Sequence, residues 1–459
     1  MPSFSSATLR LIVLSAILLS RGVAATPLRY ALRGTLVTPT GVIAHGTLVI
    51  NASRIESVSD AAPPADVPVT ETHGIICPGL IDLHNHLTWN VFPRWSSGRK
   101  FPNRYEWQQL PEYLMALAGP HATLISRGMG PAMARFAEVK AIAGGSTSLA
   151  GLYPEDLGPD FKPPYHGLMR MLDIGSGFYP DGTPEPVRYQ VFPLVVSEAQ
   201  ASDLRSGLTT GRIHSLLIHL GEGAPRDASS MLEYQILKAR GLLLPGVSLI
   251  HGVALHSEQF EEMARLGVGL VWSPRSNFEL YGATADVAAA KRAGVTIALA
   301  PDWSPTGSDG LLQELSYAST WNASQPQPVF SDAELLRMAT ANAAVLAGVQ
   351  TRIGALTPGL FADIVVVREQ SGDPIGAVVH SQPPDVLLVV VNGQPVYGER
   401  SLAKGLAPSA PWVGVRVAEA TKVVSLPAGT AVSDWVGLTA SLDAELRRAG
   451  SRLGPLSQD

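Results

Sequence analysis

The chain has 459 residues, of which 46% are hydrophobic and 16% are charged, and its formal net charge is −5. This length can hold a catalytic domain of about 250 residues together with a second module. The weak acidity and the lack of a basic cluster argue against a nucleic-acid partner. We therefore expect an ordinary globular protein whose partner is a small molecule, and a homo-oligomer is compatible with this composition.

The N-terminal segment has the pattern of a secretory signal peptide. Arg10 precedes an apolar run at 11–19, and small residues at 22–25 follow it. The apolar run is too short to span a bilayer comfortably. We predict that residues 1–25 are removed and that the mature protein is exported to the periplasm or the extracellular space, without stable membrane insertion. The alternative is an N-terminal anchor that is retained.

From 28 to 76 the chain has short runs in which apolar and polar residues alternate, and Gly and Asn residues separate these runs. Such runs are typical of hairpins in a small sheet. The same pattern of short strand-like runs returns after Arg352. Between these ends, the segment at 331–349 begins with a capping box, Ser331 and Glu334, and has helical apolar spacing. We expect one helix there, as the last helix of the catalytic domain.

Two histidines end the apolar run GLIDLHNHL at 79–87, and one residue separates them. Residues i and i+2 of a strand point to the same side, so His84 and His86 can hold one metal ion together. The single cysteine, Cys77, precedes this run and cannot form an intrachain disulfide. We expect it to be a small buried residue in the same first strand of the domain.

Three later apolar runs also end on residue types that bind metals. The run at 215–218 precedes His219, the run at 247–250 precedes His251, and the run at 295–300 precedes Asp302. His219 and His251 are 32 positions apart, close to the length of about 30 residues of one βαβ unit. The spacing therefore favours a (β/α)8 barrel, in which catalytic residues lie at the carboxyl ends of strands. His256 competes with His251, but it falls beyond the strand, where a helix begins.

This ordered set of motifs resembles the amidohydrolase superfamily, in its branch of hydrolytic deaminases and chlorotriazine-type hydrolases. The set comprises H-x-H at 84–86, H-x-x-E at 219–222, HG at 251–252, SPRSN at 273–277 and Asp302. The flanking features ADIVVV at 362–367 and VVVNGQPV at 389–396 also match. The resemblance implies an α/β fold, a (β/α)8 TIM barrel at 81–350 beside a small β-sandwich formed from 26–80 and 351–405. A C-terminal extension at 406–459 carries an amphipathic helix, marked by Trp435, Leu438, Leu442 and Leu446.

The resemblance also implies roles for the strand-end residues. His84, His86, His219 and Asp302 hold the metal, and His251 either joins them or polarises a water molecule. Three imidazoles and a carboxylate suit Zn²⁺, with Fe²⁺ or Mn²⁺ as alternatives. We expect Glu222, His251 and Asp302 to be the catalytic residues. Glu222 lies three positions after His219 and is placed to shuttle a proton.

The number of metal ions depends on the fourth strand. Members of the superfamily with two metals use a carboxylated lysine, or sometimes a glutamate, at its end. The fourth apolar run begins at Tyr189 and has no lysine at its end, whereas Glu198 lies a little further on and is an imperfect substitute. Lys140 stands earlier, in a helix-like stretch. We predict one divalent metal ion per chain.

These observations predict a hydrolase that acts on a non-peptide carbon–nitrogen bond, through attack of metal-activated water on a cyclic or heteroaromatic substrate. One alternative is a binuclear amidase, imidase or dipeptidase on the same fold. A second alternative is a non-catalytic binding or scaffold protein. The candidate substrate contacts are Trp89, Arg275, Asn277 and Trp303. The aromatic segment at 88–108 either covers a ring-shaped substrate or packs onto the barrel.

Overall fold

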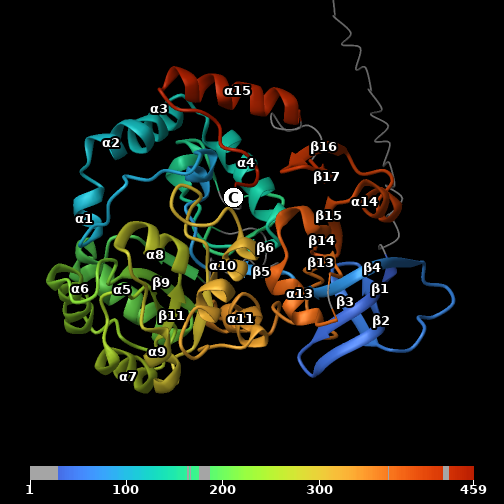
Figure 1. The fold of residues 1–459 in the computed structure, drawn as a ribbon, viewed down its shortest axis with the longest axis horizontal. Helices are drawn as coiled ribbons and strands as arrows, with labels where there is room; N and C mark the ends of the chain where they lie inside the picture. Colours follow the sequence, from blue (N-terminus) through green and yellow to red (C-terminus); the bar gives the residue numbers. More distant parts are fainter. Residues whose placement is uncertain are drawn as a thin grey trace, which may run out of the picture.

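The computed structural model describes residues 29–162, 165, 167–174, 187–370, 372–426 and 434–458. The predicted signal peptide at 1–25 lies outside these residues. Figure 1 shows the parallel strands and their helices on one side of the molecule and a large sheet on the other. Within the described residues, no helix is both long and apolar enough to cross a membrane.

Eight short parallel strands form the centre of the larger lobe. They are β5 (Leu80–Asp82), β6 (Ser146–Leu149), β7 (Arg170–Met171), β8 (Val187–Gln190), β9 (Ser215–Leu220), β10 (Val247–His251), β11 (Gly269–Trp272) and β12 (Ile297–Leu299). One sheet has the order β5-β6-β7 and the other has the order β12-β11-β10-β9-β8. A parallel bridge between Asn85 and Asp302 joins the ends of β5 and β12. Strands that are consecutive in the chain are therefore neighbours in space, although the described residues show no pairing between β7 and β8.

Helices alternate with these strands, as parallel strands require. They include α4 (Gly130–Ala143), α5 (Glu198–Thr210), α6 (Ala228–Ala239), α7 (Ser257–Leu266), α8 (Pro274–Tyr281), α9 (Val287–Ala293) and α10 (Leu311–Ala323). This lobe also contains η1 (Leu87–Val91), α1 (Arg104–Trp107), α2 (Pro111–Tyr113), η2 (Leu114–Ala118), α3 (Gly119–Ser126), η3 (Pro154–Leu157) and η4 (Pro193–Val195). Most of them lie around the strands in Figure 1.

The last helical segment of this lobe differs from the single helix that the sequence predicts. It forms two helices, α11 (Asp332–Met338) and α12 (Ala341–Leu346). The predicted capping box is confirmed, since Ser331 N donates to Glu334 Oε2 at 2.9 Å and Glu334 N to Ser331 Oγ at 3.3 Å. The helix is interrupted where the carbonyl oxygen of Ala339 accepts from Ile81 N in β5, at 2.8 Å.

The N-terminal and C-terminal segments share one nine-stranded sheet. Its strands are β1 (Arg29–Thr38), β2 (Gly41–Asn51), β3 (Arg54–Ser59), β4 (Val69–Pro78), β13 (Ile364–Arg368), β14 (Val386–Val391), β15 (Gln394–Gly398), β16 (Trp412–Val417) and β17 (Ala420–Ser425). They lie in the order β16-β17-β15-β14-β13-β4-β1-β2-β3. Beside this sheet are α13 (Pro374–His380), η5 (Pro383–Asp385) and α14 (Arg400–Leu406). The two ends of the chain meet where β4 pairs antiparallel with β13.

The position of Cys77 corrects the prediction from the sequence. Cys77 is fully buried, as expected, but it lies in β4 of the large sheet, opposite Val365, and not in one of the eight parallel strands. The chain changes sheets at Gly79, directly before β5. A Cβ atom at Gly79 would lie 2.2 Å from the Thr147 side chain. A residue with a side chain would clash here, so only glycine allows β4 to end and β5 to begin one residue later.

The predicted amphipathic segment at the C-terminus forms α15 (Trp435–Arg448). Its buried side chains are Trp435, Leu438, Leu442 and Leu446, the spacing of one helical face. Trp435 stacks on Phe136 of α4, with ring centroids 5.7 Å apart. This helix therefore covers α4 at the top of the view in Figure 1.

A buried ion pair connects the parallel strands to the large sheet. Arg170 in β7 donates from Nε to Asp363 Oδ2 at 2.7 Å and from Nη2 to Asp363 Oδ1 at 3.1 Å. Nη2 also donates to Asn392 Oδ1 at 2.9 Å, and the guanidinium lies 4.4 Å from the centroid of Phe361. A bidentate contact of this kind fixes orientation as well as distance.

Substitution of Arg170 by Met should therefore lower the free energy of unfolding by about 3 kcal/mol, because it leaves the Asp363 carboxylate buried without its cation. Calorimetric unfolding of the metal-free protein measures this loss. The matched control is Arg416→Ala, which removes an exposed pair with Glu419 and should cost less than about 0.5 kcal/mol. Equal effects of the two substitutions would contradict the prediction.

Candidate metal centre and active site

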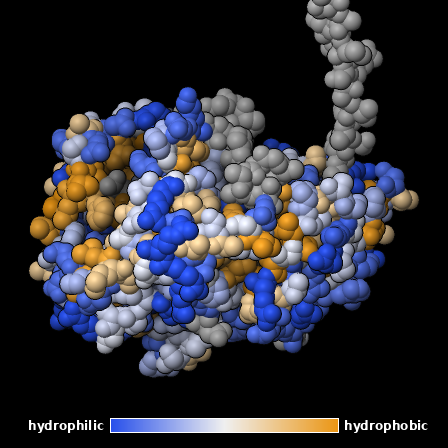
Figure 2. All heavy atoms as spheres, turned by 90° about the horizontal axis from the view of Figure 1, so that it is seen from above, coloured by the Kyte–Doolittle hydropathy of each residue, from blue (hydrophilic) through white to orange (hydrophobic). Residues whose placement is uncertain are grey.

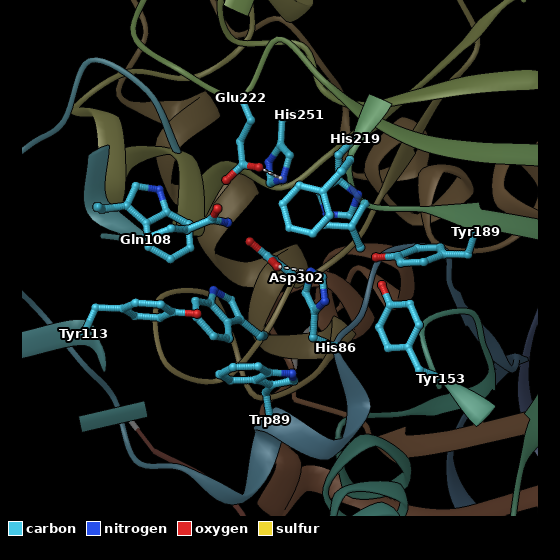
Figure 3. A pocket seen from close by; sticks show the side chains of 14 residues that line it. His86, Trp89, Gln108, Tyr113, Tyr153, Tyr189, His219, Glu222, His251 and Asp302 are labelled. Carbon is cyan, nitrogen blue, oxygen red and sulfur yellow. Dashed lines mark ion pairs between the residues drawn. The ribbon is translucent and has the colours of Figure 1, made fainter. Parts of the chain in front are cut away.

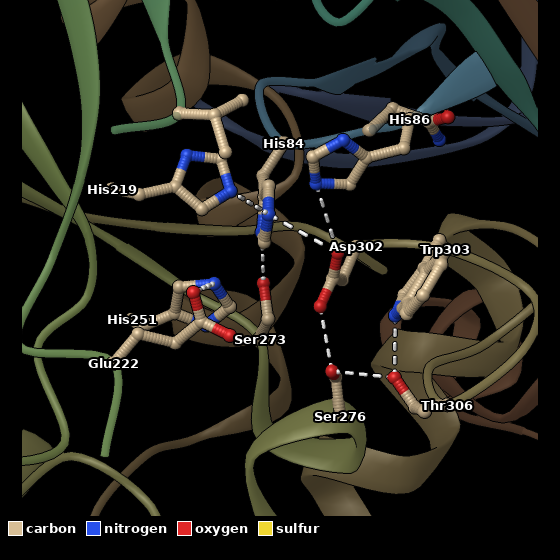
Figure 4. Close-up of polar contacts among 12 residues, drawn as sticks. His84, His86, His219, Glu222, His251, Ser273, Ser276, Asp302, Trp303 and Thr306 are labelled. Carbon is tan, nitrogen blue, oxygen red and sulfur yellow. Dashed lines mark hydrogen bonds and ion pairs between the residues drawn. The ribbon is translucent and has the colours of Figure 1, made fainter. Parts of the chain in front are cut away.

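The histidines and the aspartate predicted from the strand ends converge at one point (Figure 4). His84 and His86 follow β5, His219 lies near the end of β9, His251 ends β10, and Asp302 follows β12. His251 and Asp302 have φ angles of 72° and 70°. This left-handed region is unfavourable for residues with a Cβ atom, and such strain is concentrated at functional sites.

Potential ligand atoms from five side chains lie close together. His84 Nε2 is 3.1 Å from His219 Nε2 and 3.2 Å from Asp302 Oδ1. His86 Nε2 is 3.5 Å from the same carboxylate oxygen. Two overlapping groups have ligand atoms within 4.8 Å of one another, His84 with His219 and His251, and His84 with His86 and Asp302. His84 belongs to both groups and is their centre.

Neighbouring polar side chains set the orientation of these candidate ligands. Ser276 Oγ donates to Asp302 Oδ2 at 2.6 Å, so Oδ1 is left to face the imidazoles. His251 Nδ1 lies 2.9 Å from Asn277 Oδ1, an atom that only accepts. Nδ1 of His251 therefore carries the proton, and its Nε2 presents a lone pair. Such partners fix the tautomer of histidines that bind metals.

Burial keeps the imidazoles neutral. It lowers the pKa of His84 to about 3 and that of His86 to about 4, and it lowers the pKa of His219 well below its usual value. Burial also raises the pKa of the Asp302 carboxyl, a penalty that a bound dication would reverse. Neutral imidazole nitrogens and one carboxylate oxygen, converging in a buried place, suit a divalent cation such as Zn²⁺.

Glu222 lies beside this cluster and belongs to neither ligand group. Its Oε1 accepts from Tyr281 OH at 2.6 Å, and its Oε2 accepts from Arg104 Nη1 at 3.3 Å. The same Oε2 is 3.6 Å from His251 Nε2. Tyr281 and Arg104 therefore hold the carboxylate beside the cluster. Arg104 and Tyr281 were not predicted as site residues, because no spacing in the sequence links them to a strand end.

A pocket of about 370 Å³ opens beside the cluster (Figure 3). Aromatic side chains form most of its lining, which consists of His86, Trp89, Trp107, Gln108, Tyr113, Tyr153, Tyr189, Val191, Phe192, His219, Glu222, His251, Asp302 and Trp303. Of the candidate substrate contacts, Trp89 and Trp303 line the pocket. In the aromatic segment at 88–108, Trp107 also lines it, whereas Phe92 is fully buried in the core.

The structure places Arg275 and Asn277 away from the pocket lining, unlike the expectation from the sequence. The SPRSN motif enters helix α8, which carries these two residues to other partners. Asn277 contacts His251 and Thr284, and the Arg275 guanidinium lies 5.7 Å from the centroid of Tyr317. Asn277 therefore orients a candidate ligand.

The two residues considered for a second metal lie elsewhere. Lys140 Nζ is buried and donates to Asp309 Oδ1 at 3.1 Å and to Ser304 Oγ at 3.2 Å. Glu198 is exposed at the start of α5 and pairs with Arg205. The predicted fourth strand ends early, at Gln190, and η4 follows it. Within the described residues, the ligand groups include neither Lys140 nor Glu198.

The chain is similar to known proteins of one family. Residues 217–397 match the model of the amidohydrolase family. A putative aminohydrolase of Methanothermobacter thermautotrophicus is 23% identical over 79% of this chain and 96% of its own length. A 5-methylthioadenosine/S-adenosylhomocysteine deaminase of Syntrophobacter fumaroxidans is 32% identical, but the match covers 41% of this chain and 46% of that protein.

Solved structures have the same fold. An adenosine deaminase from Xanthomonas campestris with bound zinc superposes with a TM-score of 0.67 at 16% identity, over 92% of this chain and 99% of the other. An atrazine chlorohydrolase mutant from Arthrobacter aurescens, complexed with zinc and atraton, gives a TM-score of 0.64 at 18% identity, over 91% and 100%. The family match at 217–397, the full-length relative and the shared fold together make the chain similar to proteins of the amidohydrolase superfamily along most of its length.

Proposed function

We propose that this protein is a metal-dependent hydrolase of a non-peptide carbon–nitrogen bond in a cyclic or heteroaromatic substrate, with deamination as the leading reaction. One observation carries the proposal. Neutral, preoriented imidazoles and the Asp302 carboxylate converge at the base of an aromatic pocket, and a second carboxylate, Glu222, lies beside them without joining them. This arrangement separates metal binding from proton transfer.

The relatives support this reaction class. Their names describe deaminases of adenosine and of its 5-methylthio and 5'-deoxy derivatives, a guanine deaminase and triazine hydrolases. Three of the similar solved structures contain zinc. We therefore assign a heteroaromatic substrate to this chain and prefer zinc as its metal, with iron and manganese as alternatives.

In this proposal, His84, His86, His219 and Asp302 hold the metal, and His251 either joins them or contacts the attacking water. The bound metal would supply a Lewis acid that makes hydroxide available near neutral pH. Glu222, and also Asp302, can accept a proton from the water, and Glu222 can pass it to the substrate. A carbon–oxygen bond forms, the carbon–nitrogen bond breaks, and the leaving amine departs with the transferred proton as ammonia.

The two alternative functions have less support. A binuclear amidase or dipeptidase needs a bridging carboxylate, but Lys140 and Glu198 lie away from the cluster. A scaffold protein would not need the partners that orient each ligand, such as Ser276 and Asn277.

We further infer that the eight parallel strands close into a (β/α)8 barrel at 81–350, and that 26–80 and 351–405 build a small β-sandwich. The nine-stranded sheet also contains β16 and β17, which come from the segment predicted as a C-terminal extension at 406–459. The similarity to complete structures of the superfamily supports the barrel. Export to the periplasm or the extracellular space remains a proposal that rests on the segment at 1–25. N-terminal sequencing of the native protein tests it, and an intact Met1 would contradict it.

Protein purified without chelator should contain about one tightly held divalent metal ion per chain, because one set of ligands converges at His84. Elemental analysis measures the stoichiometry. The variant His219→Ala should lose most of this metal, since it removes a ligand, whereas His256→Ala, a histidine at the start of α7, should retain it. Two tightly held ions per chain would move the assignment to the binuclear class.

The variant Glu222→Gln should keep the fold and the metal but lower turnover by roughly 10²- to 10⁴-fold, the usual contribution of general acid–base catalysis. Screening amino-heterocycles, cyclic imides, anilides and acyl-dipeptides against the metal-loaded protein provides the substrate for this comparison. Turnover near that of the wild type, or loss of metal as complete as in His219→Ala, would refute the proton-transfer role of Glu222.

A further inference from the structure

Tyr153 places an unpaired hydroxyl group in the wall of the pocket. The residue follows β6 and lines the pocket across from Glu222 (Figure 3). Its hydroxyl oxygen is buried and has no hydrogen-bond partner among the described residues. Burying a hydroxyl without a partner is costly, so buried polar groups are nearly always paired. The missing partner is therefore expected from the molecule that fills the pocket.

Neighbouring polar groups in the pocket walls already have partners within the protein. Tyr189 OH donates to the carbonyl oxygen of Asn85 at 3.1 Å. The indole nitrogen of Trp107 donates to Tyr281 OH at 2.9 Å, and that of Trp303 donates to Thr306 Oγ1 at 2.5 Å. The hydroxyl of Tyr153 thus differs from these groups in being left for a ligand.

The ring of Tyr153 is fixed in place. It stacks against His86, with centroids 6.5 Å apart and an interplanar angle of 25°, and it meets Tyr189 at 6.0 Å. A tyrosine phenol is protonated at neutral pH and can donate a hydrogen bond. The rigid ring holds the hydroxyl at one position, which favours recognition of a particular atom.

The surroundings indicate a neutral ligand. The described lining contains no lysine or arginine that would bind a phosphate or a carboxylate. Exposed apolar side chains at Leu114 and Met115, and at Leu194 and Val195, lie within three positions of the lining residues Tyr113 and Phe192. Hydrophobic residues also gather around a hollow at one end of the molecule in Figure 2. The region around the pocket therefore favours uncharged molecules.

We propose that Tyr153 determines which substrates bind, by donating a hydrogen bond to an acceptor atom of a neutral, planar heteroaromatic ring held among the pocket aromatics. The acceptor is a ring nitrogen or a carbonyl oxygen. This inference rests on the proposed function of the same site and adds the substrate class. It also excludes substrates that carry a phosphate or a carboxylate.

Two probes of the same bicyclic shape test this role by binding alone. 4-Aminoquinazoline has ring nitrogens that accept hydrogen bonds, whereas 1-naphthylamine has none, and both are neutral at pH 7.5. Titration calorimetry with the metal-loaded Glu222→Gln variant, which is expected to turn over slowly, gives the ratio of the two affinities. Adding Tyr153→Phe should lower this ratio about tenfold, which corresponds to about 1.4 kcal/mol. Adding Tyr189→Phe instead should leave the ratio within twofold, because that hydroxyl already has a protein partner.

An unchanged ratio in a folded, metal-loaded Tyr153→Phe variant would overturn the proposal and would mean that a water molecule satisfies this hydroxyl. Failure of both probes to bind the parent variant would overturn the substrate class. Failure of the Tyr153 proposal can be distinguished from failure of the proposed function. Turnover of an amino-heterocycle with an unchanged ratio refutes only the role of Tyr153, whereas a tenfold fall in the ratio without any turnover in the panel refutes only the reaction.

Discussion

The candidate site depends on one backbone contact between the first and the last of the parallel strands. The amide of Asp302 donates to the carbonyl oxygen of His84 at 3.0 Å, and Asn85 forms a parallel bridge with Asp302. The contact brings the carboxylate that follows β12 against the histidine pair that follows β5. The positive φ angle of Asp302 turns its side chain into the centre at this same residue. The ligand set therefore exists only when these two strands meet.

A chain of buried polar side chains makes that contact rigid. Asn85 Nδ2 donates to Asp82 Oδ2 at 2.7 Å, Asn90 Nδ2 donates to Asn85 Oδ1 at 2.8 Å, and Ser304 N donates to Asn90 Oδ1 at 2.7 Å. The chain ties the loop after β5 to the loop after β12. Gly151 closes the remaining space, since a Cβ atom there would lie 1.9 Å from the carbonyl oxygen of Asn85. Networks in which each member is satisfied specify a unique arrangement, and here the arrangement is that of the ligands.

The parts of the site that could be predicted lie on strand ends, where a local pattern and a general rule of barrels agree. His84, His219 and Asp302 follow from apolar runs that stop, and the structure brings them together. Tyr281 and Tyr153 could not be predicted, because they reach the site from a helix end and from a loop whose path no periodicity describes. Cys77 shows the same limit in the fold. Its apolar run continues into β5, and only the contact of Gly79 with Thr147 marks the change of sheet.

The separation of Glu222 from the ligands follows from how the loop after β9 is held. Glu233 in α6 accepts from Gly221 N at 2.7 Å through Oε2, and through Oε1 from Arg104 Nη2 at 3.3 Å. Arg104 is thus shared between Glu233, which fixes the backbone after His219, and Glu222, whose Oε2 also lies 3.6 Å from His251 Nε2. A buried guanidinium between two carboxylates offsets the cost of burying both. The end of β9 can therefore present His219 as a neutral candidate ligand, and the loop after it can present Glu222 as a carboxylate outside the candidate ligand groups.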